Sequence, residues 1–232
     1  MRSPRDEEPA VEDADDYKSN LPPLNFGPGL KVRIPPALMP DDDTALHYFD
    51  LYFANAHPYV PVLDKETFYH QWHSSRETIS PLILEAIFAI AGRLADEPAE
   101  GQQWMALATR MSPLMVFCGK KLLTGAGHAD SFMDVPRLST LQALLIILKA
   151  REQAPKRGYY YRSWMTIVQC VQMGKDLGLD EHFTDHQAGK PCGSSASECA
   201  LKTRIWQVIF VCEIMIGSPQ GKDTRTRRGV WS

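Results

Sequence analysis

The clearest structural signal in the chain is the stretch RGYYYRSWMTIVQCVQMGKDLGLD, residues 157–180. Its three consecutive tyrosines lie between arginines, a pattern that can stack nucleic-acid bases. A second pattern competes with this one: apolar residues recur at i, i+3, i+4 and i+7, namely Trp164, Ile167, Val168 and Val171. That spacing is typical of the buried face of an amphipathic helix. We therefore expect a core helix, with Trp164 packed inside, rather than a base-stacking surface.

Both ends of this helix have a local interpretation. Gly178 is well placed to end it, because glycine adopts the left-handed conformation that other residues resist, and Leu179 is then expected to pack back on the last turn. At the other end lie Tyr159, Tyr160, Tyr161 and Arg162. These four either line an effector pocket or pack against a neighbouring helix, and we favour packing.

Further helices are predicted from capping residues and apolar periodicity. Their starting signals are the run Asp41–Thr44, then Asp64, and then Ser80 followed by Pro81. Three more are expected over residues 98–125 with a kink near Pro113, over residues 135–154 up to Pro155, and over residues 198–217. No segment shows the strict alternation of a strand. The predicted fold is an all-α, irregular domain of roughly seven helices.

Composition divides the chain into three parts. Residues 1–40 are rich in proline and acidic residues and are expected to form a flexible linker. Residues 41–220 form the predicted helical domain, including a polar loop over residues 181–198, and residues 221–232 form a basic tail. The tail, KDTRTRRGVWS, has the composition of a phosphate-contacting segment or an import signal, but it is short.

Charge and cysteine content exclude several classes of protein. The net charge of −3 gives no general attraction to nucleic acid. The five cysteines form no C-x2-C pair, so neither a disulfide framework nor a zinc ribbon is expected. No apolar run approaches the roughly 18 residues of a membrane span, and the acidic N-terminus does not resemble a secretory signal. We expect an intracellular, reduced protein with no membrane partner.

Only weak candidates for chemistry are present. The motifs of a nucleophile elbow and a phosphate-binding loop are absent from the sequence. His182, His186, Cys192 and Cys199 are metal-ligand types, but a polar loop with no evident turn to gather them favours exposed histidines and incidental thiols. His70 and His73 share a short helix without further ligands, and the acidic runs are interpreted as solvated. We therefore assign no catalytic, cofactor-binding or metal residue and expect no enzyme.

Three segments, in order, resemble one family. YYYRSWMTIVQCVQMGKDLGLD is similar to a helix of the fungal-specific transcription factor domain, the middle homology region of Zn2Cys6 zinc-cluster regulators, although Gly174 replaces a usual alanine and Asp180 a usual histidine. ALHYFDLYFANAHPYVPVLDKETF, residues 45–68, resembles its opening segment, notably at Phe49, His57 and Pro58. LKTRIWQVIFVCEIMIGSPQG, residues 201–221, resembles a later segment through Arg204, Trp206, Gly217 and Pro219.

The resemblance implies a regulatory domain of a nuclear transcription factor that acts on RNA polymerase II transcription. It also implies that zinc and DNA are bound only by a zinc-cluster head, for which this sequence lacks the six cysteines. We expect a truncated domain with a coregulator protein, a small-molecule effector or a dimer partner. Two alternatives stay open: a free-standing helical interaction module, and a metal-dependent helical enzyme that uses His182, His186 and the neighbouring cysteines.

Overall fold

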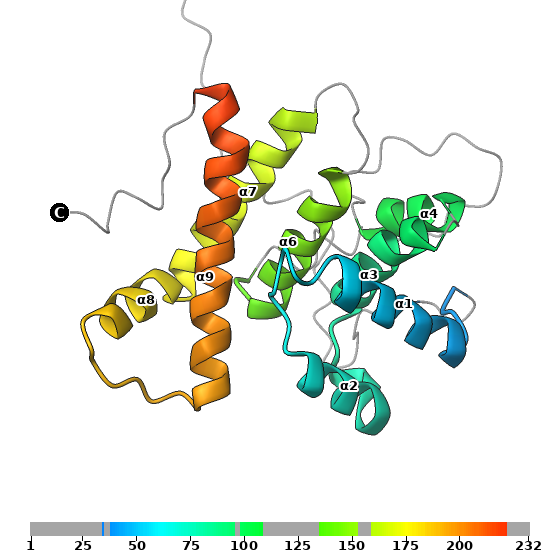
Figure 1. Cartoon of the computed structure of the whole chain (residues 1–232), viewed down its shortest axis with the longest axis horizontal. Helices are drawn as coiled ribbons and strands as arrows, with labels where there is room; N and C mark the ends of the chain where they lie inside the picture. The colour runs from blue at the N-terminus through cyan, green and yellow to red at the C-terminus, as the bar shows by residue number, and fades with distance from the viewer. Residues whose placement is uncertain (1–33, 35–37, 96–97, 109–134, 153–158, 222–232) are drawn as a thin grey trace, which may run out of the picture. The chain divides into compact units, whose positions relative to one another are not determined.

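The structure, a computed structural model, describes residue 34 and residues 38–95, 98–108, 135–152 and 159–221. Within these residues the regular elements are all helical, which confirms the predicted all-α class (Figure 1). The α-helices are α1 (Asp42–Asn55), α2 (Lys65–Ser74), α3 (Pro81–Leu94), α4 (Pro98–Ala108), α6 (Leu138–Glu152), α7 (Tyr159–Asp176), α8 (Leu179–Gln187) and α9 (Ala196–Gly217). Short 3-10 turns cover Arg76–Thr78 and Ser218–Gln220.

The first three helices begin where the capping residues predict. The Asp41 carboxylate accepts a hydrogen bond from the backbone N–H of Thr44 at 2.9 Å, and Asp64 accepts one from Thr67 at the same distance. Each bond satisfies one of the N–H groups that the first turn of a helix leaves without a partner. Ser80 occupies the capping position of α3, with Pro81 next, but its side chain makes no capping bond.

The core is built around α3, which is buried from Leu82 through Gly92. It packs against α1, α4 and α6, and α6 in turn packs against α7. An aromatic cluster joins the first three helices: the ring of Phe49 lies 4.9 Å from Phe68, 4.8 Å from Trp72 and 5.8 Å from Phe88, measured between ring centroids. Apolar burial on this scale is the main force that holds such helices together.

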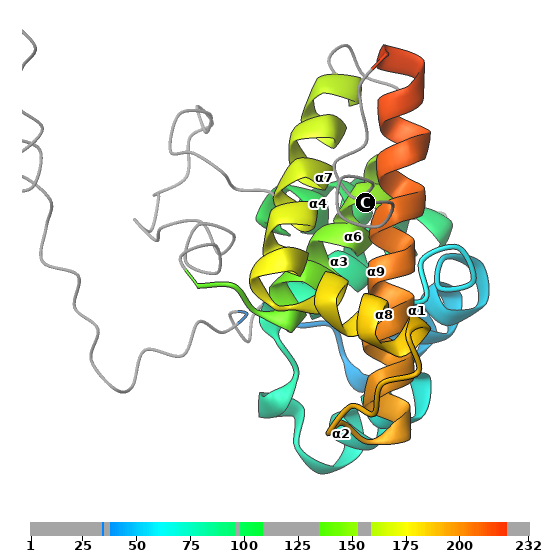
Figure 2. The same cartoon turned by 90° about the vertical axis from the view of Figure 1, so that its left-hand side faces the viewer.

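The C-terminal helices α7, α8 and α9 contact one another, and α7 runs alongside α9 (Figure 2). Trp164, Ile167 and Val171 are buried and Val168 is half-buried, which confirms that the apolar stripe of α7 is a core face. Gly178 has a φ of 68°, the left-handed conformation expected of a helix stop. Leu179 is 1% exposed and begins α8 directly.

Two expectations are wrong. Tyr160 and Tyr161 are 60% and 68% exposed and Arg162 is also exposed, because the buried stripe of α7 begins only at Ser163. The predicted polar loop over residues 181–198 is instead helical at both ends, as α8 and the first turn of α9. A glycine with left-handed backbone conformation lies near each end of α8, Gly178 before the helix and Gly189 after it.

Several predictions lie outside the described residues. These are most of the flexible linker, the kink near Pro113, the side chain of Tyr159 and nearly all of the basic tail. The division of the chain at residues 40 and 220 stays a prediction. Among the described residues, no helix combines the length and apolar character needed to cross a membrane.

Candidate metal centre

Helix α8 places two histidines on one of its faces. His182 and His186 are four residues apart, and residues at that spacing are neighbours on a helix surface. Their ring centroids lie 5.1 Å apart with the ring planes at 54°. The backbone N–H of His182 donates to the Gly178 carbonyl at 3.0 Å, so the first histidine lies in the first turn after the glycine stop.

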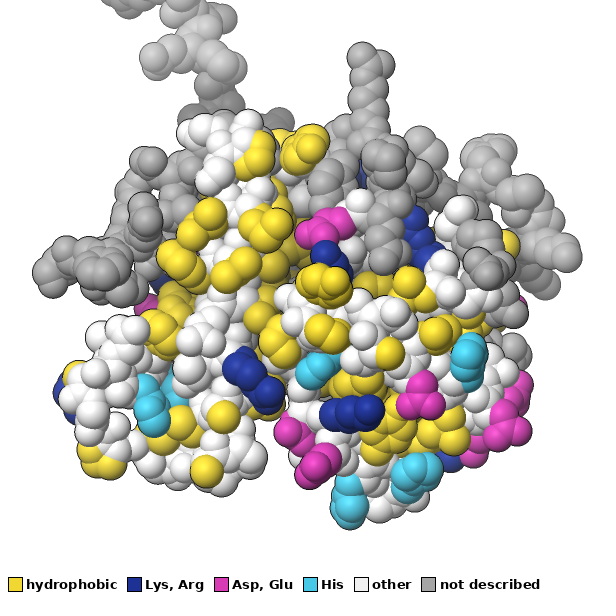
Figure 3. All heavy atoms as spheres, viewed as in Figure 1, with side chains coloured by type: hydrophobic (Ala, Val, Ile, Leu, Met, Phe, Trp, Pro, Cys, Tyr) yellow, Lys and Arg dark blue, Asp and Glu magenta, His cyan; other side chains and the backbone are white. Residues whose placement is uncertain are grey.

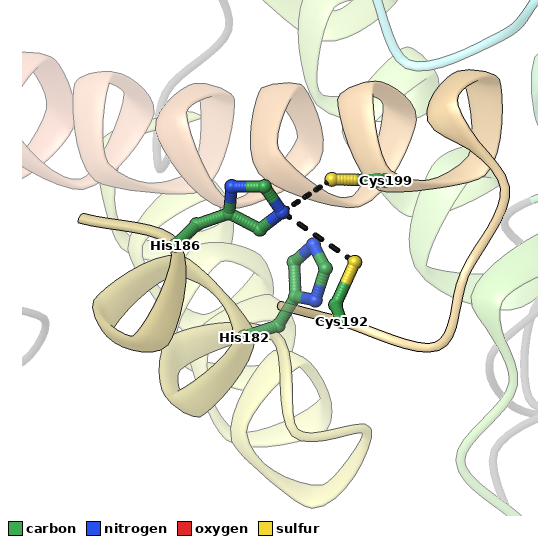
Figure 4. Close-up of side chains that lie close together, drawn as sticks. All are labelled: His182, His186, Cys192 and Cys199. Carbon is green, nitrogen blue, oxygen red and sulfur yellow. Dashed lines mark hydrogen bonds between the residues drawn. The ribbon is translucent and has the colours of Figure 1, made fainter. Parts of the chain in front are cut away.

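A tight turn then reverses the chain after α8. Gly189 has a φ of 72°, and its N–H donates to the His186 carbonyl at 3.1 Å while the N–H of Lys190 donates to the Asp185 carbonyl at 2.9 Å. This pair of bonds is the Schellman arrangement that ends many helices at a left-handed glycine. The turn directs the following residues back along α8 and brings Cys192 beside His186 (Figure 4).

The first turn of α9 supplies the second thiol. Ser195 caps this helix by accepting a hydrogen bond from the backbone N–H of Glu198 at 3.3 Å. Cys199 follows, and its N–H donates to the Ser195 carbonyl at 2.8 Å. The thiol of Cys199 therefore lies in the first turn of α9.

The four side chains converge on one point between α8 and α9. One ligand atom from each of His182, His186, Cys192 and Cys199 lies within 4.8 Å of the other three. Nε2 of His186 lies 2.7 Å from Sγ of Cys199 and 3.4 Å from Sγ of Cys192 (Figure 4). In the part of the chain that the structure describes, no other group of three or more such residues has comparable geometry.

Nε2 of His182 is buried and has no hydrogen-bond partner in the structure. The ring of His182 lies beside His186 and Cys192 in Figure 4. A buried polar atom without a partner is unfavourable, because it has lost water without gaining another bond. This nitrogen is therefore available to bind a ligand at the convergence point.

The two thiols differ in their acidity. The pKa of Cys192 lies below its ordinary value, chiefly because of its hydrogen bond with His186 and then because of the backbone N–H of Ser194. The pKa of Cys199 is raised, first by partial removal from water and then by the hydrogen bond with Cys192 and the charge of that residue. A thiolate at one of these two cysteines therefore disfavours ionisation of the other.

Two pairs of oppositely charged side chains lie beside the cluster. Lys190 binds Asp185 at 2.7 Å, and Lys202 binds Glu198 at 3.1 Å and the hydroxyl of Ser194 at 3.0 Å. These pairs are exposed or partly exposed and contribute little to stability. The ligand atoms that converge belong to the two histidines and the two thiols.

Because the sequence shows no evident turn that would gather these four residues, they are expected to lie apart. The structure contradicts this expectation, since it brings one ligand atom from each of them together. The overlooked signals are Gly189, two residues after α8 ends, and the pair Ser195 and Glu198, which has the spacing of a helix capping box. A helix stop followed by a helix start brings the two cysteines back to the two histidines.

The other sequence candidates do not assemble into a site. His70 and His73 are exposed on α2, where the hydroxyl of Ser74 donates to the His70 carbonyl at 2.7 Å. No third His, Cys, Asp or Glu among the described residues joins them in a ligand-like group. The acidic run near the N-terminus lies outside the described residues.

His57 has a structural position. Its Nε2 bonds the carbonyl of Leu63 at 2.9 Å and thereby closes the loop between α1 and α2. The pKa of this histidine is lowered, mainly because its ring is partly buried. It belongs to the opening segment by which the sequence resembles the fungal-specific transcription factor domain.

Comparison with known proteins gives a consistent result. The family described as the fungal specific transcription factor domain matches residues 49–222. An uncharacterized transcriptional regulatory protein of Schizosaccharomyces pombe is 25% identical over 174 residues, which are 75% of this chain and 24% of that protein. Cutinase transcription factor 1 alpha of Fusarium vanettenii is 23% identical over 192 residues, which are 82% of this chain and 19% of that protein.

The chain spans less than a quarter of the length of each of these relatives. No solved structure gives a significant match.

Proposed function

Because this chain belongs to the fungal specific transcription factor domain family, we propose that it is the regulatory domain of a nuclear transcription factor that controls transcription by RNA polymerase II. The observation that supports this most strongly is the family match over residues 49–222, which covers the helical body from α1 to the turn after α9. Both relatives described above are named as transcriptional regulators.

Three of the family's motif residues lie in the core of the helical body rather than at a surface site. Trp164 and Trp206 are 7% and 3% exposed, and Phe49 is fully buried. Residues buried in this way stabilise the helical body and are not accessible to a substrate. We propose that the helical body receives a signal from a coregulator protein or a small-molecule effector and transmits it through the packing of α7 against α9.

Contact with DNA is proposed to come from a zinc-cluster head outside this chain. A Zn2Cys6 head needs six cysteines around two metal ions, whereas this chain has five and none of them forms a C-x2-C pair. The net charge of −3 also gives little attraction to DNA phosphates. The chain by itself is therefore expected not to bind DNA with sequence specificity.

A second candidate function, a helical module that binds another protein, is favoured by an apolar face on α9. Val211 and Met215 are four residues apart on this helix and are 51% and 68% exposed. Figure 3 shows hydrophobic side chains along the exposed side of α9. Sedimentation velocity over a range of concentrations tests this candidate, because Met215→Glu should reduce any self-association without unfolding the chain.

The geometry argues against a metal-dependent enzyme. Catalytic zinc sites keep one coordination position open for water or substrate, whereas sites with four protein ligands are structural. The cluster between α8 and α9 offers four protein ligands. No open position for a substrate is left on a tetrahedral ion there.

A reporter assay tests the proposed function. The chain is fused to an unrelated DNA-binding domain and tethered upstream of a reporter gene in yeast, with the DNA-binding domain alone and a fusion carrying Trp206→Asp as controls. We expect the intact fusion to change reporter transcription and the Trp206→Asp fusion, whose core is disrupted, to lose the effect. An intact, folded fusion that leaves transcription unchanged would contradict the proposal, as would a gel shift in which residues 1–232 alone bind a specific DNA sequence at physiological salt.

A further inference from the structure

We propose that this domain binds one structural Zn²⁺ ion between α8 and the first turn of α9. The four ligands are Nε2 of His182, Nε2 of His186, Sγ of Cys192 and Sγ of Cys199. This inference concerns the helical body alone and does not depend on how the domain acts in transcription.

The spacing of the ligand atoms fits one small ion. In a tetrahedral zinc site, bonds of about 2.0–2.3 Å place neighbouring ligand atoms about 3.3–3.8 Å apart. The four atoms here lie within 4.8 Å of one another, and the distance from Nε2 of His186 to Sγ of Cys192 is 3.4 Å. The 2.7 Å between His186 and Cys199 is shorter than a tetrahedron allows, so binding requires a small outward rotation of one side chain.

The free nitrogen of His182 supports the same conclusion independently. Its Nε2 is buried without a hydrogen-bond partner, which is uncommon for a buried polar atom. If one thiol rotated to donate a hydrogen bond to this nitrogen, the other thiol would gain no partner. A metal ion at the shared centre satisfies the nitrogen and both thiolates at once.

The donor set selects zinc among the abundant cations. Two thiolates balance the double positive charge of the ion, and the two imidazoles complete a neutral Cys2His2 shell. Thiolate and imidazole suit Zn²⁺, whereas Ca²⁺ and Mg²⁺ prefer oxygen ligands, and no carboxylate belongs to this group. The four-ligand shell leaves no coordination site for a reacting molecule.

The local structure also shows what the ion would stabilise. Helix α8 has nine residues, and Leu179 is its one buried side chain. So little apolar burial gives weak support to a helix and to the loop of residues 188–195 that follows. A metal bound by two α8 residues, one loop residue and one α9 residue would connect all three segments, as a disulfide does.

Titration of the metal-free, reduced full chain with Co²⁺ tests the proposal, because tetrahedral thiolate-bound Co²⁺ absorbs visible light and Zn²⁺ displaces it. We expect one Co²⁺ per chain and loss of the spectrum on addition of one equivalent of Zn²⁺. The variants His182→Ala and Cys199→Ser should lose the tetrahedral spectrum. The matched controls His73→Ala and Cys212→Ser should keep it, since neither residue belongs to the cluster.

Circular dichroism of each metal-free variant separates a lost ligand from a lost fold. His186 is exposed, so His186→Ala should retain the helical content of the parent while losing the cobalt spectrum. Two outcomes would overturn the proposal: no tetrahedral spectrum in the parent chain, or a spectrum that persists in both His182→Ala and Cys199→Ser. An unchanged reporter assay would leave the metal site standing and would count only against the proposed function.

Discussion

Gly174 of α7 lies against the indole of Trp206 on α9, so closely that a Cβ added to the glycine would come within 3.0 Å of the ring atom Cζ3. The same Cβ would lie 3.1 Å from Cδ1 of Ile209. Non-bonded atoms rarely approach this closely, so α7 and α9 could not lie this near to each other if residue 174 carried a side chain. The contact joins two of the segments by which the sequence resembles its family.

Gly174→Val should destabilise the domain by about 1–3 kcal/mol, the usual cost of forcing extra methyl groups into a packed core. Urea unfolding followed by circular dichroism measures the change in the free energy of unfolding. The matched control is Gln172→Val, which places the same residue at an exposed position of α7 and removes one exposed hydrogen bond to Asp176. Helix propensity alone would make Gly174→Val slightly stabilising, so a Gly174→Val variant as stable as the parent would contradict the close contact with Trp206.

A buried hydrogen bond connects α6 to the loop before α2. Nε2 of Gln142 donates to the carbonyl of Val62 at 2.7 Å. Gln142→Leu leaves this buried carbonyl without its donor and should cost about 1–3 kcal/mol. Thermal unfolding compared with Gln207→Leu, at an exposed position of α9, checks the prediction. A Gln142→Leu variant as stable as the parent would mean that water replaces the amide.

Asp64 at the start of α2 should make the domain sensitive to acid. Hydrogen bonds from the side chain and backbone of Thr67 lower the pKa of Asp64 below its ordinary value of 3.8. A lowered pKa in the folded state means that the carboxylate stabilises the fold above about pH 4, and that this contribution is lost as the pH falls from there through the folded-state pKa.

Asp64→Ala should therefore cost about 1 kcal/mol at pH 7, the typical value of a helix cap, and less at pH 3. Unfolding titrations at the two pH values give the comparison, with Glu66→Ala on the same helix turn as the control. If the cost of Asp64→Ala is the same at pH 3 and pH 7, the carboxylate charge is not what stabilises α2.

The cysteines should differ sharply in reactivity. Burial raises the pKa of Cys212 to about 12 and raises that of the fully buried Cys170 further. At pH 8 a thiol with a pKa of about 12 is ionised in roughly one molecule in 10⁴, and the thiolate is the reactive form. Cys192, Cys199 and Cys212 are all partly exposed, so Cys212 is distinguished from the other two by its raised pKa rather than by its exposure.

A short pulse of iodoacetamide should therefore label Cys192 and Cys199 in the folded, metal-free chain and label Cys170 and Cys212 only after unfolding. Peptide mass mapping identifies the labelled sites. One equivalent of Zn²⁺ should suppress the labelling of Cys192 and Cys199 in the folded chain. It should not change the labelling of the other thiols after unfolding. Rapid labelling of Cys170 in the folded chain would contradict the packing of α7.

The fold was predictable where periodicity and capping act locally. The stripe of Trp164, Ile167 and Val171 and the stop at Gly178 follow from spacing alone, because a helix must bury its apolar face and end where glycine permits a left-handed residue. The exposure of Tyr160 and Tyr161 did not follow. Whether an aromatic ring at a helix end is covered depends on where the neighbouring helices stop.

The metal centre was only half predictable. The four residue types and their spacing were visible in the sequence, but their convergence depends on two turns, at Gly189 and at Ser195, whose combined direction emerges only in three dimensions. α8 itself has a weak apolar pattern with one buried residue. Its helical state is set by its two ends rather than by its core face.

Zinc K-edge X-ray absorption on the zinc-loaded full chain tests the metal centre most directly, because it reports the atoms bound to the ion. A site formed by His182, His186, Cys192 and Cys199 predicts two sulfur ligands at about 2.3 Å and two imidazole nitrogens at about 2.0–2.1 Å. A shell made mainly of oxygen, or one without two sulfurs, would contradict it.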